Sequence, residues 1–361
     1  MDQLVWIAIV LTTVVGPITL ALLGLFSRER SAGVRADLSA TISPMWPLLV
    51  NSTLAYALAF NLIFFLQELF LVLPKAFTPG LRPTLYHNNH TWTGDHPLGA
   101  LWQGTGVLAI ITAGCICLAV LPPLRGRSNS VRLLVLWFAY HGLIMGLAQV
   151  PVGALSPRSD LGMAMTYLAL APATKALCAI GALIAIVLVA VHLTRRAFEF
   201  AATREQLGTA RLRNRFVLHA ATLPALLGTI LIVPFRVPRE LVEVLGPPVV
   251  VAIVGTSWMQ ASAWLRRDRL VVSGATNAVA WPLAIALLVV FALFHLVLAR
   301  GVEFSAPNSP SSALARSSAS GICTSNGRLR ASSQRTTRSR SARLIAVQPL
   351  VATPGAFQMC R

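Results

Sequence analysis

Residues 46–73 read WPLLVNSTLAYALAFNLIFFLQELFLVL and contain a single charged side chain, that of Glu68. A run of this length and apolar character can cross a bilayer as an α-helix, which needs about 20 residues. Asn61 and Glu68 are seven positions apart and therefore share a face of that helix. An ionisable group at membrane depth is costly and usually faces a bundle interior or a water-filled cavity. Glu68 is therefore the first candidate functional residue.

The composition of the whole chain agrees with this segment. The 361 residues are 55% hydrophobic and 12% charged, with a mean hydropathy of +0.69. Soluble domains carry about 25% charged residues, so a water-soluble fold is excluded in favour of repeated membrane spans. The sequence predicts an all-α fold, a polytopic transmembrane helical bundle of about eight spans. The expected spans are 4–26, 46–73, 102–121, 133–152, 163–193, 216–235, 245–264 and 278–299.

The basic residues predict the orientation of this bundle. The net charge of +18 does not point to nucleic acid, because most Lys and Arg side chains lie in short clusters between apolar runs. Alternating loops hold 15 and 5 basic residues, and the richer set is expected in the cytoplasm. The N-terminus and the loop 74–101 are then outside a plasma membrane, the inner membrane of a bacterium. No cleavage site follows residues 4–26, so a removable signal peptide is not expected.

The chain divides in two by composition. Residues 1–303 form the predicted helical domain, whereas residues 304–361 are rich in Ser and Arg and lack Asp, Glu, Lys, Trp and Tyr. Such a segment cannot bury enough apolar surface to offset its chain entropy, so a disordered tail is expected. A shifted reading frame in an Arg-rich gene is an alternative origin of this abrupt change.

The predicted outer loop concentrates possible metal ligands. His87, His90, Asp95 and His96 lie within ten positions, and imidazole with carboxylate suits zinc or another divalent metal. An HxxH spacing in a loop is far less specific than HExxH on a helix, and the chain contains no HExxH. The alternative is a turn-rich lid in which neighbouring Asn, Thr and Asp side chains bind the backbone.

Three span residues are candidates for catalysis: Glu68, His141 and Gln149. Glu68 would act as general base or as a further metal ligand. His141 and Gln149 are eight positions apart and share a helix face, although a lone helix histidine is more often a hydrogen-bonding partner between helices. A structural alternative for Glu68 is an ion pair with Lys175, which the sequence places deep in the fifth span.

Three functions stay open. The first is a membrane-embedded, metal-dependent hydrolase built from the second span and the His-rich loop. The second is a transporter or ion-coupled permease that uses Glu68, Lys175 and His141. The third is a non-catalytic scaffold or accessory subunit. The expected partners are the lipid bilayer and a further copy or protein bound through small-residue helix faces such as Gly142 and Gly146.

Overall fold

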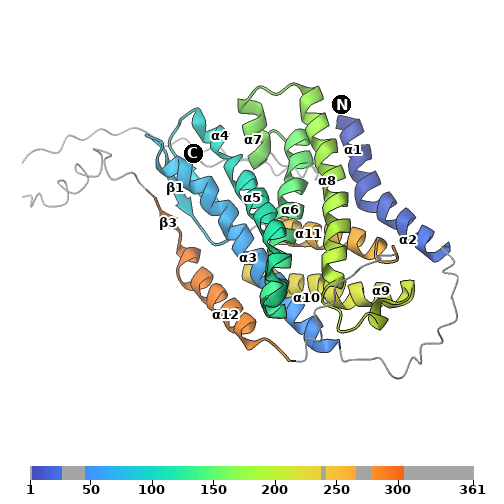
Figure 1. Ribbon diagram of the computed structural model, residues 1–361. Helices are drawn as coiled ribbons and strands as arrows, with labels where there is room; N and C mark the ends of the chain where they lie inside the picture. The colour runs from blue at the N-terminus through green and yellow to red at the C-terminus, as the bar shows by residue number, and fades with distance from the viewer. Residues whose placement is uncertain (1, 27–44, 237–240, 266–277, 305–361) are drawn as a thin grey trace, which may run out of the picture. The chain divides into compact units, whose positions relative to one another are not determined.

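The computed structural model describes residues 2–26, 45–236, 241–265 and 278–304 (Figure 1). Residues 305–361 of the predicted tail and the basic clusters at 28–35 and 266–269 lie outside this described part of the chain. The α-helices are α1 (Asp2–Val10), α2 (Gly16–Phe26), α3 (Trp46–Ala76), α4 (Leu98–Trp102), α5 (Thr105–Val120), α6 (Asn129–Leu155), α7 (Asp160–Tyr167), α8 (Pro172–Phe198), α9 (Ala210–Val217), α10 (Leu223–Ile232), α11 (Leu241–Ala261) and α12 (Trp281–Leu296). Short 3-10 helices occupy Pro123–Gly126, Glu205–Leu207, Val233–Arg236 and Leu298–Arg300, and π-helical turns occupy Leu11–Val15 and Leu218–Thr222.

The predicted number of long apolar helices is confirmed. Within the described ranges, eight helical segments are long and apolar enough to cross a membrane. They are Asp2–Gly24, Trp46–Ala76, Leu98–Val120, Asn129–Leu155, Pro172–Phe198, Ala210–Arg236, Val244–Ala261 and Trp281–Arg300. The largest difference from the predicted boundaries is that of the fifth span, which begins at Pro172 rather than at residue 163.

The fifth span is the clearest correction. The sequence predicted one span over 163–193, interrupted by Pro172 and Lys175, whereas the structure has two separate helices, α7 and α8, joined by a turn in which Ala169 adopts a φ of 50°. Pro172 opens α8, and the residue before it, Ala171, has an extended ψ of 148°. Proline disfavours a helical conformation in the residue before it but suits the first helical position, so it separates the two helices.

Helix α3 is the centre of the bundle and packs against α5, α6, α10 and α12. It continues through Pro74 to Ala76, beyond the predicted end of the second span. A proline inside a helix cannot donate to the carbonyl four positions earlier, here that of Phe70. The Thr105 hydroxyl lies 2.6 Å from that carbonyl oxygen and satisfies it from α5. This substitute bond explains how the helix extends past Pro74.

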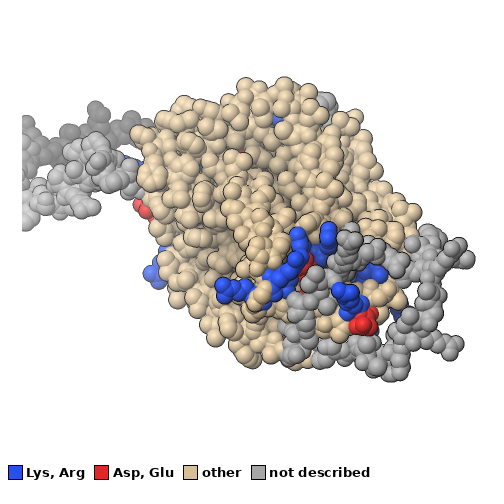
Figure 2. Space-filling model, in the orientation of Figure 1, with Lys and Arg blue, Asp and Glu red and all other residues tan. Residues whose placement is uncertain are grey.

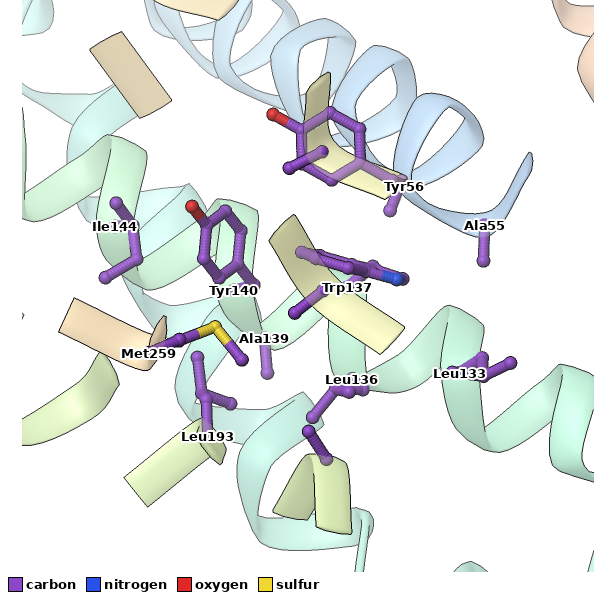
Figure 3. Close-up of a cluster of buried hydrophobic side chains, with 14 of the residues drawn as sticks. Ala55, Tyr56, Leu133, Leu136, Trp137, Ala139, Tyr140, Ile144, Leu193 and Met259 are labelled. Carbon is purple, nitrogen blue, oxygen red and sulfur yellow. The ribbon is translucent and has the colours of Figure 1, made fainter. Parts of the chain in front are cut away.

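The core between α3 and α6 is aromatic (Figure 3). Tyr56 of α3 meets the Trp137 ring edge to face at a centroid distance of 4.8 Å, and Tyr140 lies 5.0 Å from Trp137. Two buried polar groups of α6 in this core have partners on other helices. The Trp137 indole N–H donates to the Ser52 hydroxyl at 2.9 Å, and the Tyr140 hydroxyl donates to the Val251 carbonyl at 2.6 Å. These bonds fix the relative rotation of α3, α6 and α11.

Helices α5 and α6 approach each other through glycine. A Cβ placed on Gly142 would lie 2.5 Å from the Ile110 carbonyl oxygen, and one on Gly114 would lie 2.8 Å from the Leu143 nitrogen. Both obstacles are backbone atoms, which cannot move aside. The sequence pointed to Gly142 as a site of close helix approach, and the structure shows that the neighbour is α5 of the same chain.

A three-stranded antiparallel sheet lies at one end of the bundle. Its strands are β1 (Arg82–Leu85), β2 (His90–Thr93) and β3 (Val302–Glu303), in the order β2-β1-β3. The all-α prediction misses these strands, because four residues with alternating burial give too weak a sequence signal beside turn residues. Leu85 pairs with both His90 and Val302, so β1 joins the hairpin to the segment that follows α12.

The surface of the bundle is largely apolar except at the opposite end. Large apolar side chains are exposed along α1, α8 and α12, including Trp6 (57%), Leu188 (66%) and Leu288 (67%). Figure 2 shows that Lys and Arg on the displayed face gather toward the end where α9 lies. We call this the arginine end, with Arg125 and Arg196 as its reference residues, and the end with the sheet the hairpin end.

Candidate functional site

The candidate site begins with a polar stripe on α3. Asn61, Glu68 and Lys75 are spaced seven positions apart, so they lie on one face of the helix. All three are buried, and Lys75 is completely inaccessible to solvent. Two of them carry opposite charges about 10 Å apart along the helix axis. A carboxylate and an ammonium group are therefore aligned along one face of the central helix, toward the hairpin end.

His90 bridges these two charges. The β1–β2 hairpin places it on the side of the sheet that faces α3, where its side chain is 4% exposed. Its Nδ1 lies 2.7 Å from Glu68 Oε2, and its Nε2 lies 3.3 Å from Lys75 Nζ. The Asn89 side-chain oxygen accepts from the His90 backbone N–H at 2.7 Å and fixes the turn before β2. The hairpin thus positions one imidazole ring against both charged groups of α3.

Gln103, between α4 and α5, completes the contacts. Its Oε1 accepts from Lys75 Nζ at 2.7 Å and lies 3.0 Å from His90 Nε2. Its Nε2 donates to Asp160 Oδ1 at 3.0 Å. Since the carboxylate of Asp160 accepts from the amide nitrogen, the amide oxygen must face Lys75 and His90. We call Glu68, Lys75, His90, Gln103 and Asp160 the Glu68 network.

The packing around Lys75 replaces the water that its ammonium group has lost. Nζ donates to the Leu71 carbonyl oxygen at 2.9 Å as well as to Gln103, and it lies 4.5 Å from the centroid of the Trp92 ring. The Trp92 and His90 rings stack at a centroid distance of 5.7 Å. A buried charge needs such compensation, because an unpaired one costs several kcal/mol.

The arrangement can hold one proton at either of two nitrogens. The His90 Nδ1–H donates to Glu68, which leaves Nε2 to accept a hydrogen bond from Lys75. If the proton instead moves from Lys75 to His90, Nε2–H can donate to the Gln103 oxygen, which already lies within reach. In both protonation states the ring nitrogens of His90 have hydrogen-bond partners. Proton transfer along Lys75, His90 and Glu68 therefore leaves no buried polar group without a partner.

The network is closed to large molecules. Glu68, Lys75, His90 and Gln103 are all buried, whereas Asp160, in the first turn of α7, is partly exposed. A hollow of about 400 Å³ lies at the same end of the bundle. It is lined by Pro74, Phe77, Thr78, Pro79, His96, Leu98 and Trp102, and thus by none of the buried members of the network. The network therefore connects with the surface at Asp160 rather than through this hollow.

The predicted catalytic residues fall into two places. Gln149 pairs with Gln67, the neighbour of Glu68, through an amide hydrogen bond of 2.9 Å. His141 instead lies in the aromatic core, completely buried, with Nε2 3.1 Å from the Tyr56 carbonyl oxygen. Tyr56 and Glu68 are separated by about 18 Å along α3. The structure thus brings Gln149 to the depth of Glu68 and leaves His141 far from it.

The predicted metal ligands are also separated. His90 belongs to the Glu68 network, His87 is buried with its ring 6.4 Å from that of His295, and Asp95 is exposed. His96 Nδ1 accepts from the Leu98 backbone N–H at 3.2 Å. In the described part of the chain, no three His, Cys, Asp or Glu side chains form a group that could hold a metal ion. The zinc site stays a prediction, and these residues do not gather around one point to support it.

Lys175 does not pair with Glu68. It lies in the first turn of α8 and is partly exposed, because Pro172 starts that helix only three residues earlier. Lys75 is the lysine that shares the network with Glu68, and the sequence reading placed it at the exit from the membrane. The signal that identifies Lys75 is the seven-residue spacing that extends from Asn61 through Glu68. Gln103 and Asp160 come from later segments and have no comparable signal.

The comparison with known proteins does not assign this chain to a family. No protein-family profile, no curated protein and no solved structure matches this chain.

Proposed function

We propose that the chain is a multi-pass integral membrane protein that carries protons across the membrane, with the Glu68 network as part of the proton path. Its eight apolar helices support insertion, and so does the exposure of apolar side chains such as Leu188 and Leu288 over the bundle surface. The orientation follows from the distribution of basic residues, with the arginine end in the cytoplasm and the hairpin end outside.

One observation carries the proton-handling role. Three titratable side chains, those of Glu68, His90 and Lys75, lie in direct contact inside a membrane-spanning bundle. Ionisable groups at such a place are costly and are commonly members of proton or ion pathways. Relays need fixed donors and acceptors rather than access for a substrate, and burial of the network meets this requirement. Gln103 joins this group to the partly exposed Asp160 by a hydrogen bond, which positions the side chains and carries no proton because an amide does not titrate.

The hydrolase alternative fits this geometry less well. A general base must reach its substrate, but Glu68 and His90 are closed off, and both ring nitrogens of His90 face protein groups. An ammonium group 3.3 Å from Nε2 also opposes the approach of a divalent cation. Stoichiometric zinc in purified protein, lost in a His87→Ala/His90→Ala variant, would favour the hydrolase over the proton carrier.

The test is proton flux into proteoliposomes. Purified protein is reconstituted in vesicles that contain a pH-sensitive dye, and valinomycin with potassium prevents a charge build-up during an external acid step. We expect the wild-type protein to acidify the lumen several-fold faster than empty vesicles do, and Glu68→Gln to return the rate to that of empty vesicles. The matched control is Asp95→Asn, which removes an exposed carboxylate from the same end. Equal rates for wild type and Glu68→Gln would refute the proposal.

A further inference from the structure

The arginine end contains a second charged cluster that the proposed function does not use. Glu199, at the C-terminus of α8, accepts hydrogen bonds from three guanidinium groups. Its Oε1 lies 3.2 Å from Arg125 and 2.9 Å from Arg196, and its Oε2 lies 3.0 Å from Arg132. Three cations surround one anion, so this group of described side chains carries a net charge of +2.

The three arginines differ in burial, and this decides which of them can bind a ligand. The Arg132 side chain is 1% exposed and also lies over the Phe200 ring at 4.8 Å. Its buried charge requires the carboxylate of Glu199, which is itself 6% exposed. The Arg196 side chain is 17% exposed and that of Arg125 is 47% exposed. The charge that Glu199 cannot neutralise is therefore presented at the surface by Arg125 and Arg196.

Helix α6, which carries Arg132, adds to the positive potential. Helix α6 begins at Asn129, and its N-cap residue Ser128 makes no side-chain hydrogen bond to the first turn. The first N–H groups of a 27-residue helix carry a partial positive charge that favours a phosphate oxygen. Guanidinium groups bind phosphate in the same way, with two parallel N–H donors.

An apolar surface continues from this cluster toward the middle of the bundle. Val131 in the first turn of α6 is 45% exposed, Val120 at the end of α5 is 40% exposed, and Leu188 of α8 is 66% exposed. Leu134 and Val135 follow on α6 and are partly exposed. In Figure 1, α5 and α8 lie on the two sides of α6 at this level. A ligand with an anionic head and apolar chains matches both parts of this surface.

We infer that Arg125 and Arg196 form a binding site for the headgroup phosphate of an anionic phospholipid, whose acyl chains lie against α6 between α5 and α8. The head would meet the surplus positive charge at the end of the bundle, and the chains would cover the exposed valine and leucine side chains. Glu199 is the positioning residue: it holds both guanidinium groups at one place and keeps Arg132 paired.

The experiment compares lipids and arginine pairs on the purified full-length protein. Dioleoylphosphatidylglycerol and dioleoylphosphatidylcholine are titrated in detergent, and native mass spectrometry counts bound lipid while thermal unfolding is followed in parallel. The test variant is Arg125→Gln/Arg196→Gln. The control variant is Arg127→Gln/Arg195→Gln, which removes the same charge from the adjacent, exposed positions.

We expect the wild type to bind the anionic lipid more tightly than the zwitterionic one and to unfold at a higher temperature with it. The test variant should lose at least about tenfold in apparent affinity, since a hydrogen bond to a charged group is worth that or more. The control variant should lose less than about threefold, because exposed charges act only at long range. Equal losses in the two variants, or equal binding of the two lipids, would overturn the inference. So would equal stabilisation by inorganic phosphate, since the acyl chains would then contribute nothing.

Discussion

His90 of strand β2 lies 2.7 Å from Glu68 of helix α3, which is 22 positions earlier in the chain. The pair fastens the β1–β2 hairpin to the centre of the helix bundle, and both side chains are at most 5% exposed. Replacing either Glu68 or His90 alone leaves a buried polar side chain without its partner, whereas replacing both removes the two polar groups together. The pair therefore lends itself to a double-mutant cycle.

Glu68→Ala should lower the unfolding free energy by about 3–5 kcal/mol, the usual cost of stranding one member of a buried charged pair. His90→Ala should cost a similar amount, and the double variant should cost clearly less than the sum of the two. Chemical denaturation in detergent micelles measures all three. Additive effects would show that the 2.7 Å contact is not energetically coupled.

Lys75→Met should destabilise the protein by about 1–3 kcal/mol, because the Gln103 oxygen and the Leu71 carbonyl lose a buried donor. Lys175→Met is the matched control: the same substitution at a partly exposed position should change stability by less than about 0.5 kcal/mol. Equal effects at the two positions would contradict the assignment of Lys75 as the buried lysine. Thermal unfolding of the two variants, measured side by side with the wild type, tests this prediction.

Gly142→Ala should destabilise the bundle by about 1–3 kcal/mol or prevent folding, since the added methyl group meets the backbone carbonyl of Ile110. Gly181→Ala provides the control within a helix of the same bundle. A Cβ there has nothing within 4 Å, so this substitution should be neutral or stabilising by about 0.5–1 kcal/mol through helix propensity. Detergent-solubilised yield and unfolding temperature report both outcomes.

The orientation can be checked by cysteine labelling of intact cells. In a chain whose native cysteines are replaced by serine, Thr93→Cys on β2 should react with a membrane-impermeant maleimide added outside, because this exposed position lies at the hairpin end. Arg127→Cys, exposed at the arginine end, should react only after the membrane is permeabilised. The reverse pattern would invert the topology inferred from the basic residues.

The sequence was sufficient to predict the long apolar helices but not the contacts between them. Length and hydropathy located all eight apolar segments, since each is a local property of 20 or so residues. Pro172 and Pro74 show the limit of sequence-based prediction, because Pro172 begins a helix whereas α3 continues through Pro74. The Phe70 carbonyl released by Pro74 finds its donor in Thr105, a partner from another helix that no local pattern reveals.

The same distinction applies to the site. The burial of Glu68 follows from its position in an apolar run, and Gln149 pairs with Gln67, the neighbour of Glu68. The partner of Glu68 could not be derived, because the hairpin register decides which of several loop histidines faces α3. His141 shared a helix with Gln149 but lies two turns deeper, among aromatic rings where it has structural contacts.

Strand β3 follows α12 after the short 3-10 helix Leu298–Arg300, and it pairs with β1 of the hairpin that carries His90. Helix α12 packs mainly against α3, and only Leu283, Leu287 and Phe291 of its side chains are buried. The hairpin therefore cannot lift away from Glu68 unless α12 moves with it or the β1–β3 pairing breaks. In the membrane setting that we propose, lipid against the exposed face of α12 would resist that movement, so bilayer thickness and viscosity would affect how readily the buried carboxylate is uncovered. The exposure of Glu68 would then depend on the hairpin and on the surrounding membrane together.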